Sequence, residues 1–252
     1  MEFMEPSAGS GHILGVIPAR GGSRGIPLKN IRPLLGRPLI SYTIEAARRA
    51  KGMDACLVST DSEQIAQVAM EAGAWVPFLR PAELATDEAP TWSTLRHAII
   101  YYEEITGASV HSVVTLQPTT PLRLPEDIDG AIEKYLAAQP EADCLVSACQ
   151  VNHMHPLTLY RAEGIWLRPF LPGENHTRRR QEWEKFFWRN GAVYISRREL
   201  VIEGKRVVGD RPLLYEMPAA RSVSIDTEED LKMAEMRLKF RCALEAGGVE
   251  LA

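Results

Sequence analysis

The chain has 252 residues, 45% of them hydrophobic and 25% charged, and its formal net charge is −4. This length suits one large α/β domain with a substantial core, and the slightly acidic balance argues against a surface that coats nucleic acid. No apolar run is long enough to cross a bilayer, so a membrane partner is not expected.

The N-terminus and the cysteines indicate the compartment. Residues 1–12 lack the basic and apolar regions of a signal peptide, and we expect a disordered leader there. The cysteines are scattered without a CxxC pair, which favours buried free thiols over disulfides. They are Cys56, Cys144, Cys149 and Cys242. We therefore expect a cytoplasmic protein.

Short apolar runs alternate with segments of helical period, which predicts a mainly parallel sheet flanked by helices. Strands are predicted at 13–18, 56–59, 112–116 and 144–148. Helices are predicted at 38–50, from 61 to 72, at 91–102, from 125 to 135 and after 226. Asp61 fits the N-cap of its helix, and a polar contact in a ligand site is the alternative interpretation.

The pattern breaks between about 151 and 189, a stretch rich in Pro, His, Arg and Trp. A loop of this length without structure is unusual unless it is functional, so we predict a single domain at 13–246 with one excursion. His153 and His155 raise a zinc site as the weaker interpretation, because no matching ligand cluster stands near them in sequence. The aromatic residues at 183, 186, 187 and 188 suit either a ligand or an interface, and their density favours the interface.

The glycine-rich segment Ala19–Asn30 (ARGGSRGIPLKN) directly follows the first predicted strand and carries the strongest signal. Its glycines allow the backbone to approach a ligand closely, and its clustered cations and serine hydroxyl suit a triphosphate. These residues are Gly21, Gly22, Gly25, Arg20, Arg24, Lys29 and Ser23. The segment is neither a Walker A loop nor a dinucleotide turn. A glycine-rich turn with solvated basic residues is the alternative interpretation.

With this loop in place, the chain resembles the CMP-sialic acid synthetases (acylneuraminate cytidylyltransferases). The matching segments follow in the family's order: LGRPLISYTIEAA, STDSEQIAQVA, LQPTTPLR, NGAVYI and SIDTEEDL. The resemblance spans residues 13 to about 234. It implies a Rossmann-like α/β fold of the nucleotide-diphospho-sugar transferase type, and a homodimer in which the excursion serves dimerisation and the sugar site. The related CMP-Kdo synthetases have a different first loop.

The resemblance also implies the reaction. CTP and a nine-carbon 2-keto-3-deoxy sugar acid would give a CMP-sugar and pyrophosphate, by Mg²⁺-dependent (or Mn²⁺-dependent) attack of the anomeric hydroxyl on the α-phosphate. The implied nucleotide-binding residues are Ala19, Arg20, Gly21, Gly22, Ser23, Lys29 and Asn30. The implied sugar-binding residues are Gln117, Arg123, Arg180, Gln181, Asn190, Gly191 and Ala192. Asp226 is implied to bind the metal and, with Arg20 and Lys29, to act in catalysis.

Two departures from the family pattern bear on these expectations. Many members carry a second aspartate two residues before the metal-binding one, where this chain has Ser224. Many also have a proline and a tyrosine where this chain has Glu184 and Phe187, a difference that bears on sugar specificity. A sugar-1-phosphate nucleotidyltransferase and a non-catalytic nucleotide-binding module therefore remain as alternative functions. A nucleotide panel and a turnover assay separate them.

Overall fold

The computed structural model describes residues 11–23, 25–151, 154–171 and 179–247, without the side chains at 180 and 245–247. The predicted leader therefore lies outside the described residues, apart from residue 11 and from His12, which opens the first strand. Arg24 and His153, which the sequence singled out, also lie outside them.

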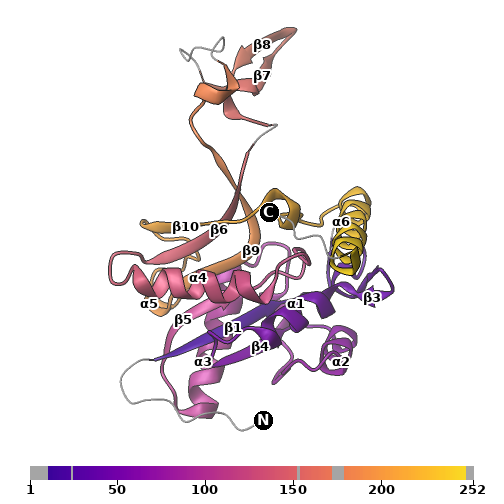
Figure 1. Ribbon diagram of the computed structural model, residues 1–252. Coiled ribbons are helices and arrows are strands. Elements are labelled where there is room, and N and C mark those ends of the chain that lie inside the picture. Colours follow the sequence, from indigo (N-terminus) through magenta and orange to yellow (C-terminus); the bar gives the residue numbers. More distant parts are fainter. Residues whose placement is uncertain (1–10, 24, 152–153, 172–178, 248–252) are drawn as a thin grey trace.

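A six-stranded sheet forms the centre of the molecule, in the order β10-β6-β9-β5-β1-β4 (Figure 1). Its strands are β1 (His12–Pro18), β4 (Ala55–Ser59), β5 (Val110–Thr115), β6 (Cys144–Gln150), β9 (Phe187–Arg197) and β10 (Pro212–Glu216). Within this sheet β9 runs antiparallel to β5 and β6, and the other pairings are parallel. The prediction of a mainly parallel sheet is confirmed.

Helices cover both faces of the sheet because its strands are apolar on both sides. Ile13 and Ile17 of β1 join one buried cluster, whereas Leu14 and Val16 join the other. The first cluster packs under α1 (Leu39–Arg49), α2 (Glu63–Glu71) and α4 (Pro125–Ala137). The second packs under α3 (Thr91–Thr106) and α5 (Arg198–Ile202). The result is a three-layer α/β domain.

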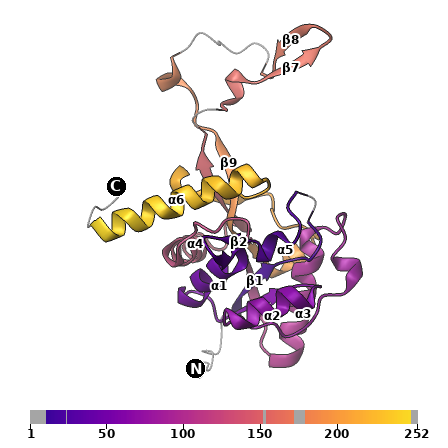
Figure 2. The ribbon, with the colours of Figure 1, turned by 90° about the vertical axis from the view of Figure 1, so that its right-hand side faces the viewer.

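The last helix, α6 (Glu228–Gly247), lies across the main body beneath the excursion (Figure 2). Its buried residues Leu231, Ala234 and Leu238 form a third apolar cluster with residues of the first loop and of the segment after β5. No helix in the described part of the chain is long and apolar enough to cross a bilayer. The remaining short elements are β2 (Pro33–Leu34), β3 (Arg37–Pro38), and the 3-10 turns η1 (Lys29–Ile31), η2 (Ala82–Leu84), η3 (Pro156–Thr158), η4 (Arg180–Glu182) and η5 (Ala219–Arg221).

The chain order places a crevice at the carboxyl end of β1. After β1 the chain enters β4 on one side, and it later returns to β5 on the other side. Connections that leave neighbouring parallel strands in opposite directions open a crevice there, which is where open α/β sheets bind ligands. The first loop follows β1, and the segment LQPTTPLR follows β5, so both border this crevice.

The predicted excursion is a hairpin that projects away from the main body (Figure 1). Its strands are β7 (Tyr160–Glu163) and β8 (Trp166–Pro169), whose side chains are nearly all exposed. It ends sooner than the sequence pattern indicated, because β9 already begins at Phe187. Sequence periodicity missed β9 and β10 as strands. β9 is antiparallel, and Gly191 in its middle adopts a positive φ of 74° that interrupts the alternation.

The four cysteines are free thiols, as predicted. Cys144 and Cys149 are buried, Cys56 is partly buried and Cys242 is exposed, so the expectation of burial fails for Cys242. Burial raises the pKa of the Cys56 and Cys144 thiols to about 12, which leaves them protonated and unreactive near neutral pH.

Candidate active site

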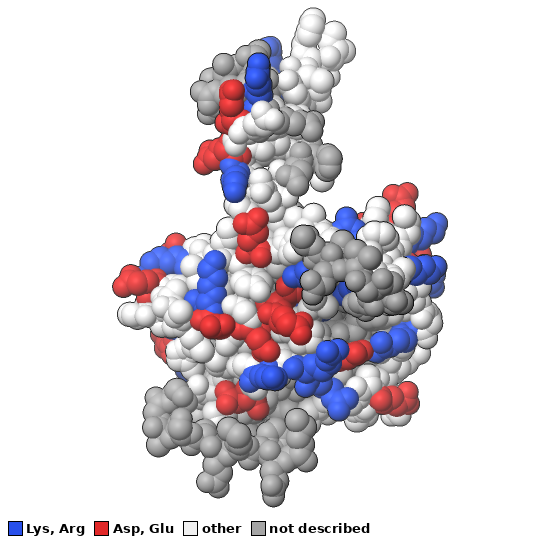
Figure 3. All heavy atoms as spheres, viewed as in Figure 1, with Lys and Arg blue, Asp and Glu red and all other residues white. Residues whose placement is uncertain are grey.

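A cavity of about 420 Å³ opens at the crevice between the first loop, the segment from Arg80 to Thr94 and the segment after β5. The sequence-predicted residues that line it are Arg20, Gly22, Ser23, Lys29, Asn30, Gln117 and Asp226. Basic and acidic side chains are intermingled over the main body on the face shown in Figure 3. The main body therefore has no uniformly basic face here, and an anionic ligand would be neutralised by the basic side chains that line the cavity.

The first loop is held in shape from beneath. The backbone N–H of Gly21 donates to Oδ1 of Asp61 at 2.9 Å, and Nδ2 of Asn30 donates to the carbonyl oxygen of Arg20 at 2.9 Å. Asp61 therefore holds the backbone of the first loop and is not the N-cap of its helix. The cap of α2 is Ser62, whose side chain accepts the N–H of Ile65. Ala19, fully buried, and Gly21 lie behind the cavity wall.

Lys29 joins the first loop to the segment that precedes α6. Its Nζ donates to Oδ1 of Asp226 and to the carbonyl oxygen of Ile225, both at 2.9 Å. The side chain of Asp226 is 73% exposed, so one carboxylate oxygen stays open to the cavity. A Cβ on Gly25 would collide with the carbonyl oxygen of Asp226, which explains the glycine at this crossing. The two segments, almost 200 residues apart, form one wall.

Asp226 is in turn positioned by the first turn of α6. Oδ2 of Asp230 accepts the backbone N–H groups of Asp226 and Thr227, and the Thr227 hydroxyl as well. These hydrogen bonds lower the pKa of Asp230 against the opposing effect of burial, which is the largest single influence on it. Asp230 therefore stays ionised and holds the backbone that carries Asp226.

Arg80 is a site residue that the sequence analysis missed. Its side chain is buried, with Nη1 donating to Thr94 Oγ1 at 2.9 Å and Nη2 3.5 Å from Asp61 Oδ1. That ion pair is not aligned as a hydrogen bond, and in the described part of the chain both Nε and Nη2 lack a hydrogen-bond acceptor. Burial lowers the pKa of this guanidinium and Asp61 opposes the shift, but an arginine remains a cation. Buried donors without acceptors beside a cavity are suited to a ligand.

Asp87 is a second residue that the sequence did not indicate. Its carboxylate contacts Nη2 of Arg20 at 2.6 Å, and both side chains line the cavity. Asp87 lies in the segment between η2 and α3, which carries no glycine motif and no metal-ligand spacing. Asp87 comes close to the first loop only because of the way the chain folds.

On the opposite side of the cavity, Gln117 is fixed by Arg123. Nη2 of Arg123 donates to the Gln117 carbonyl oxygen at 2.7 Å, and its Nε donates to the carbonyl oxygen of Ala192 at 2.6 Å. Arg123 is 3% exposed. Burial lowers its pKa to about 9, a change opposed by Asp127, so it is still protonated at pH 7. Arg123 was expected to bind the sugar, but it lies beneath the cavity and positions Gln117.

Asn190 and Ala192, also expected at the sugar, are buried in the same layer. Asn190 Oδ1 accepts from Ser147 Oγ and from the N–H of Ala192, and its Nδ2 donates to Ser222 Oγ. This network ties β6 and β9 to the segment that leads to Asp226. These two residues therefore support the site from below and do not line it.

Gly191 is required by both conformation and space. Its φ is 74°, and a Cβ would collide with Oε1 of Gln117. Gly191→Ala is therefore expected to destabilise the fold by about 1–3 kcal/mol through left-handed strain and to displace Gln117. Gly107→Ala is the matched control, since Gly107 has φ 70° and nothing within 4 Å of its Cβ position. Thermal unfolding of both proteins measures the difference, and equal losses would show that Gln117 is not displaced.

The excursion holds the remaining predicted sugar residues. Gln181 is exposed in η4 and does not line the cavity of its own chain, and the side chain of Arg180 lies outside the described part. His155 accepts the Leu157 N–H through Nδ1, so its Nε2 donates to the carbonyl oxygen of Glu184. Its ring stacks on Trp183 with 4.5 Å between centroids. Both nitrogens of His155 are thus in use as hydrogen-bond partners, so neither is open to a zinc ion in this structure.

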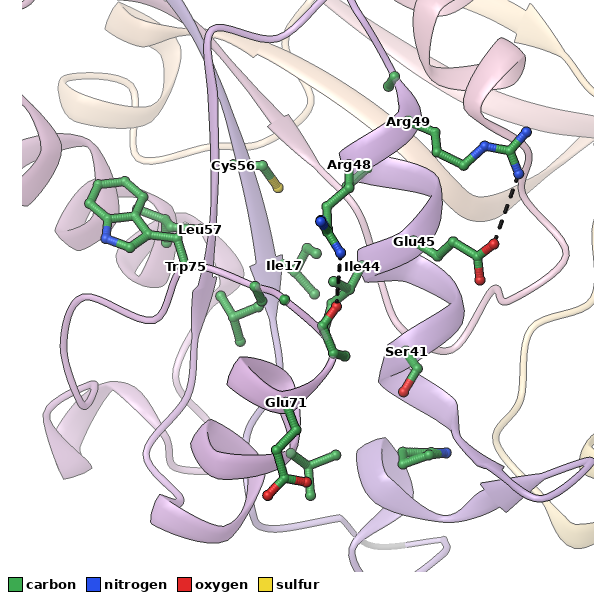
Figure 4. Close-up of a pocket in the computed structure, with 18 of the residues that line it drawn as sticks. Ile17, Ser41, Ile44, Glu45, Arg48, Arg49, Cys56, Leu57, Glu71 and Trp75 are labelled. Carbon is green, nitrogen blue, oxygen red and sulfur yellow. Dashed lines mark hydrogen bonds and ion pairs between the residues drawn. The ribbon is translucent and has the colours of Figure 1, made fainter. Parts of the chain in front are cut away.

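A larger cavity, of about 910 Å³, lies between α1, β4 and α2 (Figure 4). Its polar side chains have structural partners: Arg49 pairs with Glu45, and Arg48 reaches the carbonyl oxygen of Ala72 at the end of α2. The cations therefore stabilise a helix end and a helix surface. The sequence-predicted catalytic residues line the smaller cavity at the crevice instead.

The chain is similar to several known proteins. A family model described as Cytidylyltransferase matches residues 14–245. A CMP-N,N'-diacetyllegionaminic acid synthase from Legionella pneumophila is 35% identical, with 90% of this chain and 97% of that protein covered. An N-acylneuraminate cytidylyltransferase from Streptococcus agalactiae is 34% identical, and the match covers 85% of this chain and 50% of that longer protein.

The fold has counterparts among solved structures. A CMP:2-keto-3-deoxy-manno-octonic acid synthetase complexed with CTP superimposes with a TM-score of 0.68 at 17% identity, covering 92% of this chain and 100% of that one. A 4-diphosphocytidyl-2C-methyl-D-erythritol synthase from Anaerococcus prevotii gives a TM-score of 0.61 at 13% identity, with coverage of 91% and 96%. At these identities the likeness concerns the fold. The family match, which extends over almost the whole chain, and the relatives above 30% identity show that this chain belongs to the cytidylyltransferase family of nucleotidyltransferases.

Proposed function

We propose that this enzyme transfers CMP from CTP to the anomeric hydroxyl of a nonulosonic (sialic-type) acid and releases pyrophosphate. The observation that carries the proposal is the crevice cavity, which the cations Arg20, Lys29 and Arg80 line together with Gln117 and Asp226. Clustered cations and loop N–H groups suit a triphosphate. The names of the relatives, a legionaminic acid synthase and an N-acylneuraminate cytidylyltransferase, support the class of acceptor.

The reaction is a displacement at phosphorus. The oxygen of the anomeric hydroxyl attacks the α-phosphorus and its proton passes to solvent, while the bond from that phosphorus to the α,β-bridging oxygen breaks and pyrophosphate leaves with the electron pair of that bond. Such a step needs positioning and charge neutralisation more than covalent participation by the protein. Arg20 and Lys29 are the residues that we assign to the phosphates, and Gln117 is assigned to the acidic sugar.

Asp226 is the carboxylate that we assign to Mg²⁺ (or Mn²⁺), whose charge would neutralise the nucleotide phosphates. One oxygen of Asp226 is held by Lys29, and the side chain is largely open to the cavity. Mg²⁺ is commonly held by one or two carboxylates together with phosphate oxygens and water. Ser224 lines the same cavity and contributes a hydroxyl without charge. The residues present fit an ion that arrives with the nucleotide.

A homodimer completes the proposal. Exposed apolar side chains cover the excursion hairpin; they are Tyr160, Ile165, Trp166, Leu167 and Phe170. An isolated two-stranded hairpin is marginally stable in water, and an exposed apolar patch marks an interaction surface. In a dimer this hairpin would cover the partner's crevice and bring Arg180 and Gln181 to it, whereas Gln181 does not line the cavity of its own chain.

Replacing Trp166, which is 65% exposed, by glutamate is expected to yield a monomer of 28.1 kDa with little loss of thermal stability. The introduced charge would be desolvated in the dimer but solvated in the monomer. Sedimentation velocity measures the mass, and Met70→Glu on α2 is the matched control for a charge on an exposed apolar site. A Trp166→Glu protein that stays dimeric would place the interface elsewhere.

The test of the function is pyrophosphate release from CTP and Mg²⁺ with separate acceptors: N-acetylneuraminate, Kdn, N,N'-diacetyllegionaminate, pseudaminate and Kdo. We expect release with a nine-carbon acid and with CTP in preference to UTP, GTP and dTTP. Turnover only with a sugar 1-phosphate, or CTP binding without turnover on any acceptor, would contradict the proposal and favour the two alternative functions.

A further inference from the structure

The ion pair between Arg20 and Asp87 joins two walls of the crevice cavity. Arg20 follows β1 directly, whereas Asp87 belongs to the segment between η2 and α3. The carboxylate lies 2.6 Å from Nη2 of Arg20, and the side chains are 34% and 38% exposed. Both line the cavity. A nucleotide phosphate that binds Arg20 would therefore have the Asp87 carboxylate as its neighbour.

The charges around the cavity are balanced in pairs. Lys29 pairs with Asp226, Arg80 lies 3.5 Å from Asp61, and Arg20 pairs with Asp87. Two of the carboxylates have a further task in the geometry described above. Asp61 holds the Gly21 N–H, and Asp226 is joined to Lys29 and fits a metal ion. Asp87 also lines the cavity, and its carboxylate contacts Arg20, the cation that we assign to phosphate.

We infer that Asp87 is a specificity-determining residue, a fixed negative charge that selects the metal-bound nucleotide over the metal-free one and opposes retention of pyrophosphate. This inference rests on the proposed function. A metal-free nucleoside triphosphate carries about four negative charges, and Coulomb repulsion from a carboxylate a few ångströms away is felt strongly in a cleft of reduced dielectric. A bound divalent cation removes two of those charges, so the repulsion falls. Pyrophosphate without its metal is repelled in the same way.

The place of the Asp87 carboxylate in the cavity lining is what the inference depends on, because a negative charge elsewhere on the surface would not have this effect. Glu88 is the next residue, is also exposed and does not line the cavity. Glu88→Gln therefore makes the same change in net charge a few ångströms away. Asp87→Asn keeps the size of the side chain and an oxygen that can accept from Arg20, while it removes the charge. Asp87→Glu keeps the charge.

The experiment measures calorimetric binding of CTP and of pyrophosphate to the full chain, with EDTA and separately with excess Mg²⁺. For Asp87→Asn we expect Kd values in EDTA to fall by about threefold to tenfold, the size of effect of one nearby charge in a partly exposed site. With excess Mg²⁺ the change should fall to about twofold to threefold, because halving the ligand charge halves the Coulomb energy. Asp87→Glu and Glu88→Gln should behave like the wild type.

Each other outcome overturns the inference in a recognisable way. Equal effects with and without Mg²⁺ would show that Asp87 shapes the loop without selecting charge. Weaker CTP binding specifically in Mg²⁺ would make Asp87 a metal ligand. Unchanged binding by Asp87→Asn, in a protein that binds CTP, would remove its role. A wild-type protein that does not bind CTP at all would instead contradict the proposed function.

Discussion

Asp226→Asn is expected to lower kcat for CMP-sugar formation by about 100-fold or more, the size of effect seen when one preorganised electrostatic group is removed. The amide keeps the oxygen that accepts from Lys29, so the wall between the first loop and α6 is retained. What is lost is the negative charge that fits a divalent cation beside the nucleotide phosphates. Steady-state kinetics over a range of Mg²⁺ concentrations measures the change.

The metal dependence separates this role from a structural one. If Asp226 holds the ion, the Mg²⁺ concentration for half-maximal rate rises in Asp226→Asn, and the melting temperature stays close to that of the wild type. Glu228→Gln is the matched control, because Glu228 is an exposed acid at the start of α6 that pairs with Arg32. Near-normal turnover in Asp226→Asn would remove this carboxylate from the mechanism.

Arg80→Met is expected to weaken CTP binding by about 10- to 100-fold, since hydrogen bonds to a charged group contribute about 1.5–3 kcal/mol. The substitution keeps the hydrophobic stem and removes the two donors, Nε and Nη2, that lack acceptors in the described structure. Those neighbouring donors match either two phosphate oxygens or the O2 and N3 acceptors of cytosine. Calorimetry with CTP and with UTP distinguishes the two, because a loss for CTP alone points to the base.

Arg80→Lys tests whether the paired donors of the guanidinium, and not only its positive charge, are needed to bind CTP. It keeps the cation beside Asp61 but not the pair of parallel donors, so it should restore stability without restoring affinity. Arg37→Met provides a surface control, because Arg37 is half-exposed and pairs with Glu45 away from the crevice. If Arg80→Met bound CTP normally, Nε and Nη2 of Arg80 would not be contacts of the nucleotide.

The local sequence determined four of the six strands of the central sheet and the helices α1, α2, α3, α4 and α6. Apolar runs buried on both faces predicted β1, β4, β5 and β6 to within three residues, because a strand inside a three-layer domain has no polar face. The glycines and cations of the segment Ala19–Asn30 indicated an anion site, since such a composition has a direct chemical reason. The family resemblance followed from these motifs and is confirmed.

Tertiary structure decided which residues meet. Arg80 and Asp87 stand in a segment without a motif. Trp75 and Leu79 pair in parallel with Leu57 and Thr60, so the segment that carries Arg80 arrives at the edge of the sheet where β1 and β4 end. Arg123 and Asn190 belong to motifs of the site, yet packing buries them and directs their hydrogen bonds to the backbone and to neighbouring side chains. A motif records that a position matters to the site. Whether its side chain reaches the ligand or supports a neighbour depends on which other side chains bury it, and that is a property of the packed fold.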